Sequence, residues 1–148
     1  MKIVLQRVSS AGVSVDGQLV AEIKQGYLLL VCVMAEDETQ DILKVAEKIA
    51  KLRIFEDDDE KMNCSLSDVA GEILSISQFT LAGEVRKGNR PSFTQARRPE
   101  EASALFDLFN STLRSAGFPV KTGVFGAHME VSLVNDGPVT LVIESKRR

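Results

Sequence analysis

The sequence predicts an α+β fold, in which residues 1–148 form one domain with a mixed β-sheet or open barrel of about seven strands and two main helices. Three features predict it. Hairpin-like turns separate the first apolar runs, which favours antiparallel pairing. Two longer segments carry apolar residues at helical spacing. Short strand-like apolar runs follow each of these segments, and the 148 residues suffice for one sizeable core.

The first three strands are expected over residues 2–15, 19–23 and 27–33. The first is irregular, because residues 9–12 interrupt its apolar pattern. Asp16-Gly17 favours a two-residue hairpin turn, since both positions of a type I′ turn need positive φ. The third run is apolar without interruption, as expected of a strand that is covered on both faces.

Two helices and four further strands complete the prediction. Thr39 is the expected cap of the first helix, whose apolar stripe begins at Ile42, while Pro99 opens the second helix and Gly117 ends it. Residues 56–60 form an acidic loop. The remaining strands are expected over residues 72–77, 120–124, 128–134 and 139–143.

Composition excludes several classes of protein. No apolar run approaches the ~18 residues of a membrane-spanning helix, and the N-terminal apolar run is too short for a signal peptide. The two cysteines, Cys32 and Cys64, do not make a disulfide framework, so the cytoplasm is the expected location. The net charge of -3 argues against a surface that is basic overall and binds nucleic acid, but it is compatible with a local basic patch.

Most familiar catalytic sets are missing. His128 is the only histidine, and a lone histidine beside an alternating strand is more often structural than catalytic. Cys64 has no second cysteine at metal-binding spacing, and no phosphate-binding or dinucleotide-binding glycine pattern occurs. We therefore expect no metal and no cofactor. An enzyme built from this chain would work with hydroxyls, backbone groups or the substrate itself.

Two segments are candidates for a site. Ser77-Gln78-Phe79-Thr80-Leu81 concentrates two hydroxyls and an amide where a strand leaves the sheet, a common place for functional residues. A plain strand end with hydroxyls bonded to nearby backbone is the alternative. Asn135-Asp136-Gly137-Pro138-Val139-Thr140 lies between two strand-like runs, and Pro138 makes an ordinary hairpin turn there unfavourable. It is either a simple strand breaker or a turn with a cis Gly137-Pro138 bond.

A local basic patch is the third feature. Its five basic residues fall between positions 86 and 98 without an acid among them: Arg86, Lys87, Arg90, Arg97 and Arg98. Lys146-Arg147-Arg148 adds a basic tail. Such clusters can follow phosphates in a protein of acidic total charge, although a solvated loop would have the same composition.

With these motifs in place, the sequence closely resembles the D-aminoacyl-tRNA deacylases, which remove D-amino acids from mischarged tRNA. The resemblance covers nearly the whole chain, including residues 1–8 and 88–93. Residues 77–81 and 135–140 are its most specific parts, since they look like the two signature motifs of the family.

The resemblance implies a homodimer acting on aminoacylated tRNA, with active sites at the subunit interface. Gly137-Pro138 would be cis, would enter the site of the partner and would reject L-amino acids, while glycine on a non-cognate tRNA would also be removed. Arg7 and Asn135 would support that loop. Ser77, Gln78, Phe79 and Thr80 would line the catalytic pocket. Phe125 and Met129 would flank the terminal adenosine. A tRNA substrate also needs phosphate contacts, and the positive charge of the basic patch makes its residues the candidates: Arg86, Lys87, Arg90, Arg97 and Arg98.

Two mechanisms and two rival functions remain open at this point. Either Thr80 Oγ attacks the ester, or water attacks with help from the ribose 2′-hydroxyl, which we favour because no general base is evident. Backbone N–H groups near Phe79 and Thr80 would stabilise the oxyanion. The rivals are an RNA-binding module without catalysis, which usually has more aromatic residues, and a small hydrolase of free D-amino acid esters or peptides.

Overall fold

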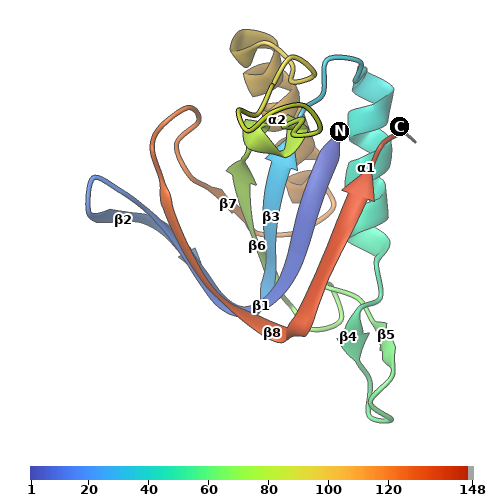
Figure 1. Ribbon diagram of the computed structural model, residues 1–148. Coiled ribbons are helices and arrows are strands. Elements are labelled where there is room, and N and C mark those ends of the chain that lie inside the picture. The colour runs from blue at the N-terminus through green and yellow to red at the C-terminus, as the bar shows by residue number, and fades with distance from the viewer. Residues whose placement is uncertain (147–148) are drawn as a thin grey trace.

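The computed structural model describes residues 1–146. Figure 1 shows a strongly bent sheet with two α-helices. The elements, in chain order, are β1 (Lys2–Val15), β2 (Gln18–Ile23), β3 (Gly26–Cys32), α1 (Thr39–Lys51), β4 (Phe55–Glu56), β5 (Met62–Cys64), β6 (Glu72–Ser77), the one-turn helix η1 (Phe79–Ala82), α2 (Pro99–Ser115), β7 (Val120–Thr122) and β8 (Glu130–Glu144).

The main sheet has six strands, in the order β2-β1-β3-β6-β7, with β8 paired to β1. Strand β1 is antiparallel to β2, β3 and β8, whereas β3–β6 and β6–β7 are parallel pairs. Parallel neighbours need long crossover connections, and the segments that contain α1 and α2 supply them. A separate two-stranded sheet is formed by β4 and β5.

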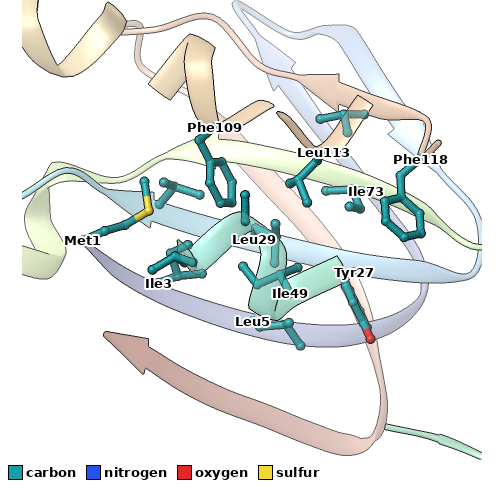
Figure 2. Close-up of a cluster of buried hydrophobic side chains, with 14 of the residues drawn as sticks. Met1, Ile3, Leu5, Tyr27, Leu29, Ile49, Ile73, Phe109, Leu113 and Phe118 are labelled. Atoms are coloured by element: carbon teal, nitrogen blue, oxygen red, sulfur yellow. The ribbon is translucent and has the colours of Figure 1, made fainter. Parts of the chain in front are cut away.

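The two faces of the sheet are covered in different ways. Both helices pack on one face, where they bury Leu29 together with Ile49 and Phe109 (Figure 2). On the other face, the part of the sheet formed by β1, β2 and β8 bends back over β3 and β6, so that Val13 packs in one cluster with Leu28. Alternate residues of β3 therefore enter two different cores, as predicted for an uninterrupted apolar strand.

The predicted class is confirmed: the fold is α+β, with two helices and a mixed, nearly closed sheet. Both helices lie where the sequence places them. Thr39, however, is the first helical residue, and Glu38 caps the helix in a capping box with Asp41. Within residues 1–146, no helix is long and apolar enough to cross a membrane.

One predicted division of the chain was wrong. The runs at 128–134 and 139–143 belong to one strand, β8, because β1 pairs with both halves and carries the strand through the Gly-Pro segment. The predicted acidic loop is confirmed for residues 57–60, which form the turn of the β4–β5 hairpin, whereas Glu56 belongs to β4. In the turn, Asp57 accepts bonds from the backbone N–H groups of Asp59 and Lys61.

Candidate functional site

A cavity of about 660 Å³ opens at the end of β6. Three segments that are distant in sequence form its walls. They are residues 76–80 at the end of β6 and in η1, residues 96–99 at the start of α2, and residues 125–129 before β8, with Val33, Phe93, Ala102, Phe106 and Val131 completing the lining. All four predicted pocket residues from Ser77 to Thr80 are among them.

The path of the chain after β6 places these residues at the cavity. Gln78 N–H donates to the Val31 carbonyl at 2.7 Å, which anchors the strand end to β3. The chain then turns through η1, whose Leu81 and Gly83 N–H groups bond to the Gln78 and Thr80 carbonyls. Phe79 is thereby left 58% exposed. The predicted strand end is thus an ordered turn facing a cavity.

Cys32 lies behind this turn. Its Sγ is 3.6 Å from the Phe79 carbonyl oxygen, and it packs in a small cluster with Met34 and Ala82. Burial raises the pKa of the Cys32 thiol, so the group is a neutral packing element. Cys32 is thus a core residue.

The hydroxyl of Thr80 has one hydrogen-bond partner within residues 1–146. It accepts from the side-chain amide Nε2 of Gln78. An amide N–H is a donor and cannot remove the hydroxyl proton, so the general base that nucleophilic attack requires is absent from the described contacts of Thr80.

Aromatic rings also line the cavity. Phe125 lies 6.1 Å from Phe106 between ring centroids, and Phe79 makes an edge contact with Phe93 at 5.3 Å. Met129 lines the cavity in the same segment as Phe125, residues 125–129. The two residues predicted to flank the adenosine, Phe125 and Met129, therefore line one cavity. His128 also lines the cavity.

The second motif forms a bulge in β8. Gln6 pairs with Thr140 and Val8 pairs with Asn135, so that residues 136–139 lie opposite Arg7 alone. The Asn135 side chain closes this bulge: its Oδ1 accepts from Val139 N–H at 3.0 Å and its Nδ2 donates to Thr140 Oγ1 at 2.9 Å. The Gly137-Pro138 bond is cis, as the resemblance implies, and both residues are exposed.

Arg7 holds the bulge from the inside of the fold. Its Nε donates to the Asp136 carbonyl at 3.1 Å and lies 3.4 Å from the Asp136 carboxylate. Its Nη1 donates to the Ile54 carbonyl at 2.7 Å and to Glu56 Oε2 at 2.9 Å. This hydrogen bond from Arg7 lowers the pKa of the Glu56 carboxyl below its usual range. The predicted support by Arg7 and Asn135 therefore has a direct geometric basis.

One chain does not bring its two motifs together. None of residues 135–140 lines the cavity that contains Ser77 to Thr80. Strand β8 pairs only with β1 within the described chain, and Val134 and Val142 are 57% and 63% exposed. The loop and its strand therefore present an open edge and an exposed apolar surface.

The predicted basic patch divides into two groups. Arg97 donates to the Ala35 carbonyl and forms an ion pair with Glu101 at 2.9 Å, and Arg86 lies 3.6 Å from Glu84. Lys87, Arg90 and Arg98 form no ion pair within residues 1–146, and Arg98 lines the cavity. Arg147 and Arg148 of the predicted basic tail lie outside the described residues, and Lys146 pairs with Asp41 at 3.2 Å.

Some parts of the site have no signal in the sequence. Phe93, Ala96 and Phe106 line the cavity, but they are separated from β6 by a long connection, and nothing in their local pattern indicates a site. Composition alone places Glu56 in an acidic loop and gives no sign of its contact with Arg7. In the described part of the chain, no group of three or more His, Cys, Asp or Glu side chains could hold a metal ion.

Comparison with known proteins gives consistent matches over the whole chain. The family described as D-Tyr-tRNA(Tyr) deacylase matches residues 4–144. The D-aminoacyl-tRNA deacylase of Bacillus cytotoxicus is 57% identical over 146 residues, which are 99% of this chain and 100% of the relative. The enzyme of the same name from Exiguobacterium sibiricum is 55% identical and covers 97% of this chain and 99% of its own.

Two solved structures share the fold. A protein described as c-Myc DNA Unwinding Element Binding Protein superposes with a TM-score of 0.93 at 41% identity, covering 99% of this chain and 100% of its own. A probable eukaryotic D-amino acid tRNA deacylase has a TM-score of 0.82 at 18% identity, covering 96% and 97% respectively. At that identity, the second likeness concerns the fold alone.

Proposed function

This chain belongs to the D-Tyr-tRNA(Tyr) deacylase family, as its sequence motifs predict, and we propose that it hydrolyses the ester bond of D-aminoacyl-tRNA to give a free D-amino acid and tRNA. The observation that carries the proposal is the cavity at the end of β6, whose lining combines Gln78 and Thr80 with aromatic rings that include Phe125. A lining of polar groups and rings suits an aminoacyl ester attached to an adenosine.

The chemistry asks little of the protein. An aminoacyl ester is already activated, so positioning a water molecule and stabilising the oxyanion are the main tasks. Water attacks the ester carbon with help from the neighbouring ribose 2′-hydroxyl, and the released ribose oxygen takes a proton. Backbone N–H groups of Phe79 and Thr80 are suited to stabilise the oxyanion. The single amide partner of the Thr80 hydroxyl within residues 1–146 supports this route over attack by Thr80.

Selection between D and L substrates needs a steric obstruction to the side chain of the L-amino acid, because the two substrates share every functional group. We assign the obstruction to the exposed Gly137-Pro138 loop of a second copy of the chain, which enters the cavity described above. One edge of β8 has no strand partner within residues 1–146, and together with the exposed Val134 and Val142 this edge supports a homodimer. Glycine has no side chain to obstruct, so glycyl-tRNA is accepted as well.

A comparison of four substrates tests this function. We expect hydrolysis of a D-aminoacyl-tRNA and of glycyl-tRNA, with little hydrolysis of the matching L-aminoacyl-tRNA or of the matching free D-ester. Equal turnover of the free D-ester would identify a small esterase that ignores RNA. Tight binding of tRNA without hydrolysis would identify an RNA-binding module.

Thr80→Ala is expected to keep turnover of D-aminoacyl-tRNA within about tenfold of the unsubstituted enzyme, because it removes a positioning hydroxyl and no nucleophile. Single-turnover rates measured with saturating enzyme report on this directly. Thr80→Ser serves as the control that retains the hydroxyl. If Thr80→Ala lowered the turnover rate by several orders of magnitude and Thr80→Ser restored it, Thr80 would be identified as the nucleophile.

The double substitution Lys87→Ala and Arg90→Ala is expected to weaken tRNA binding and to lower the slope of log Kd against log salt by about 1 for each phosphate that loses its cation. Both side chains are free of ion pairs within residues 1–146, which leaves them available to phosphates. Filter binding over a range of salt concentrations measures the slope. Lys44→Ala, at an exposed position on α1, removes positive charge elsewhere and should leave the slope unchanged.

A further inference from the structure

We propose that Glu56 is a positioning residue for the Gly137-Pro138 loop and that it acts through Arg7. Glu56 lies at the end of β4, in the acidic hairpin that the proposed mechanism does not use. The inference rests on the proposed role of the loop in selecting D substrates. It adds a residue outside both sequence motifs to the structural basis of that selection.

The first step is that Arg7 connects the Gly137-Pro138 loop to the β4 segment. Its guanidinium donates to the Asp136 carbonyl of the loop at 3.1 Å. It also donates to the carbonyl of Ile54, the residue before β4, at 2.7 Å and to Glu56 Oε2 in β4 at 2.9 Å. A Cβ at Gly137 would lie 3.3 Å from Arg7 Nη2, so the guanidinium is in close contact with the loop backbone. A shift of the guanidinium would therefore move the loop or break its bond to Asp136.

The second step is that the aromatic rings beside Arg7 do not by themselves fix its orientation. It is buried, and the rings beneath it form a stack: Phe55 lies 5.5 Å from Tyr27 at an interplanar angle of 17°, and the Arg7 Cζ is 5.7 Å from the Phe55 centroid. A ring stack fixes the depth of a guanidinium but not its rotation in its own plane. Directional hydrogen bonds from Nη1 and Nε fix that rotation.

The third step separates Glu56 from the other carboxylate that Arg7 contacts. Asp136 belongs to the loop and moves with it, so its contact with Arg7 cannot fix the position of the loop relative to the core. Glu56 follows Phe55 in β4, and Phe55 is buried in the main core. Among the charged groups that pair with Arg7 within residues 1–146, Glu56 is the only one outside the loop. It therefore ties the loop to the core.

The test compares Glu56→Gln with Glu60→Gln, which makes the same chemical change in the same hairpin at an exposed residue without a contact to Arg7. We expect Glu56→Gln to lower the ratio of D to L turnover by about five- to tenfold, as the loss of one charge-assisted bond allows, mainly through faster L hydrolysis. Glu60→Gln should leave the ratio unchanged. Glu56→Asp, which retains the carboxylate, should recover part of the ratio.

A second readout follows the loop without substrate. The Val139 amide, which bonds to Asn135 Oδ1, should exchange its hydrogen faster in Glu56→Gln than in Glu60→Gln when measured by NMR. Unchanged exchange and an unchanged D to L ratio in Glu56→Gln would overturn the positioning role. Failure of the proposed function would give a different result, because the unsubstituted enzyme would then hydrolyse D and L substrates equally. The exchange measurement needs no substrate, so it would still test whether Glu56 positions the loop.

Discussion

Gly137→Ala is expected to lower turnover of D-aminoacyl-tRNA by about two orders of magnitude or more, because a displacement of ~1 Å in a positioned group can cost that much. Gly137 has a φ of +136°, a conformation that L side chains rarely adopt. A Cβ there would lie 2.7 Å from Val139 Cγ2 and 2.8 Å from Val139 N. The Val139 backbone is held by Asn135, so the new methyl group must displace the loop itself.

Single-turnover hydrolysis of a D-aminoacyl-tRNA measures the effect, with circular dichroism and thermal unfolding as checks on the fold. Gly117→Ala is the matched control: Gly117 also has a positive φ, +102°, but nothing lies within 4 Å of a Cβ at that position. It carries the backbone strain without the crowding, and its activity should remain near that of the unsubstituted enzyme. Undiminished D turnover in a folded Gly137→Ala protein would contradict a role for the loop in the site.

The local sequence pattern was enough to predict elements that are buried in the same way along their length or that are bounded by residues with local backbone preferences. Residues 27–33 are apolar without a break because both faces of β3 are buried, and a strand of that kind can be recognised without knowing its partners. Pro99 marks the start of α2, and Gly117 follows its end, because backbone chemistry at helix ends is local. The polar cluster after β6 was recognisable for the same reason, since Ser77 to Thr80 are contiguous.

Features that depend on contacts between distant segments were not predictable from local pattern. The sequence of β8 has an interruption at Gly137-Pro138, and only its pairing with both halves of β1 makes it one strand. Glu56 lies 49 positions from Arg7 in sequence, and its acidic neighbours suggest no more than a charged turn. Phe93 and Phe106 reach the cavity through the crossover between β6 and β7, a consequence of topology that periodicity does not encode.

The close approach of β3 and β6 is such a long-range feature, and it leads to the largest effect that we expect on stability. Gly26→Ala should lower the free energy of unfolding by about 3 kcal/mol or more, the upper range for overpacking. Gly26 pairs with Glu72 where the parallel strands begin, and a Cβ there would lie 1.8 Å from the Glu72 carbonyl oxygen and 2.8 Å from its carbon and nitrogen. These are backbone atoms, so no side-chain rotation relieves the contact.

Gly12→Ala provides the comparison that assigns this effect to the clash. Gly12 is also a strand residue of the same sheet, but a Cβ there would lie 3.4 Å or more from its nearest neighbours, which is ordinary contact. Urea unfolding of both variants should therefore separate them clearly, with Gly12→Ala close to the unsubstituted protein. Because β3 and β6 carry Val31 and Ser77 to the cavity end of the same pair, Gly26→Ala should also loosen the anchor between Gln78 and Val31. Equal stability of the two variants would mean that the parallel pair tolerates wider spacing, and that the anchor between Gln78 and Val31 does not depend on that spacing.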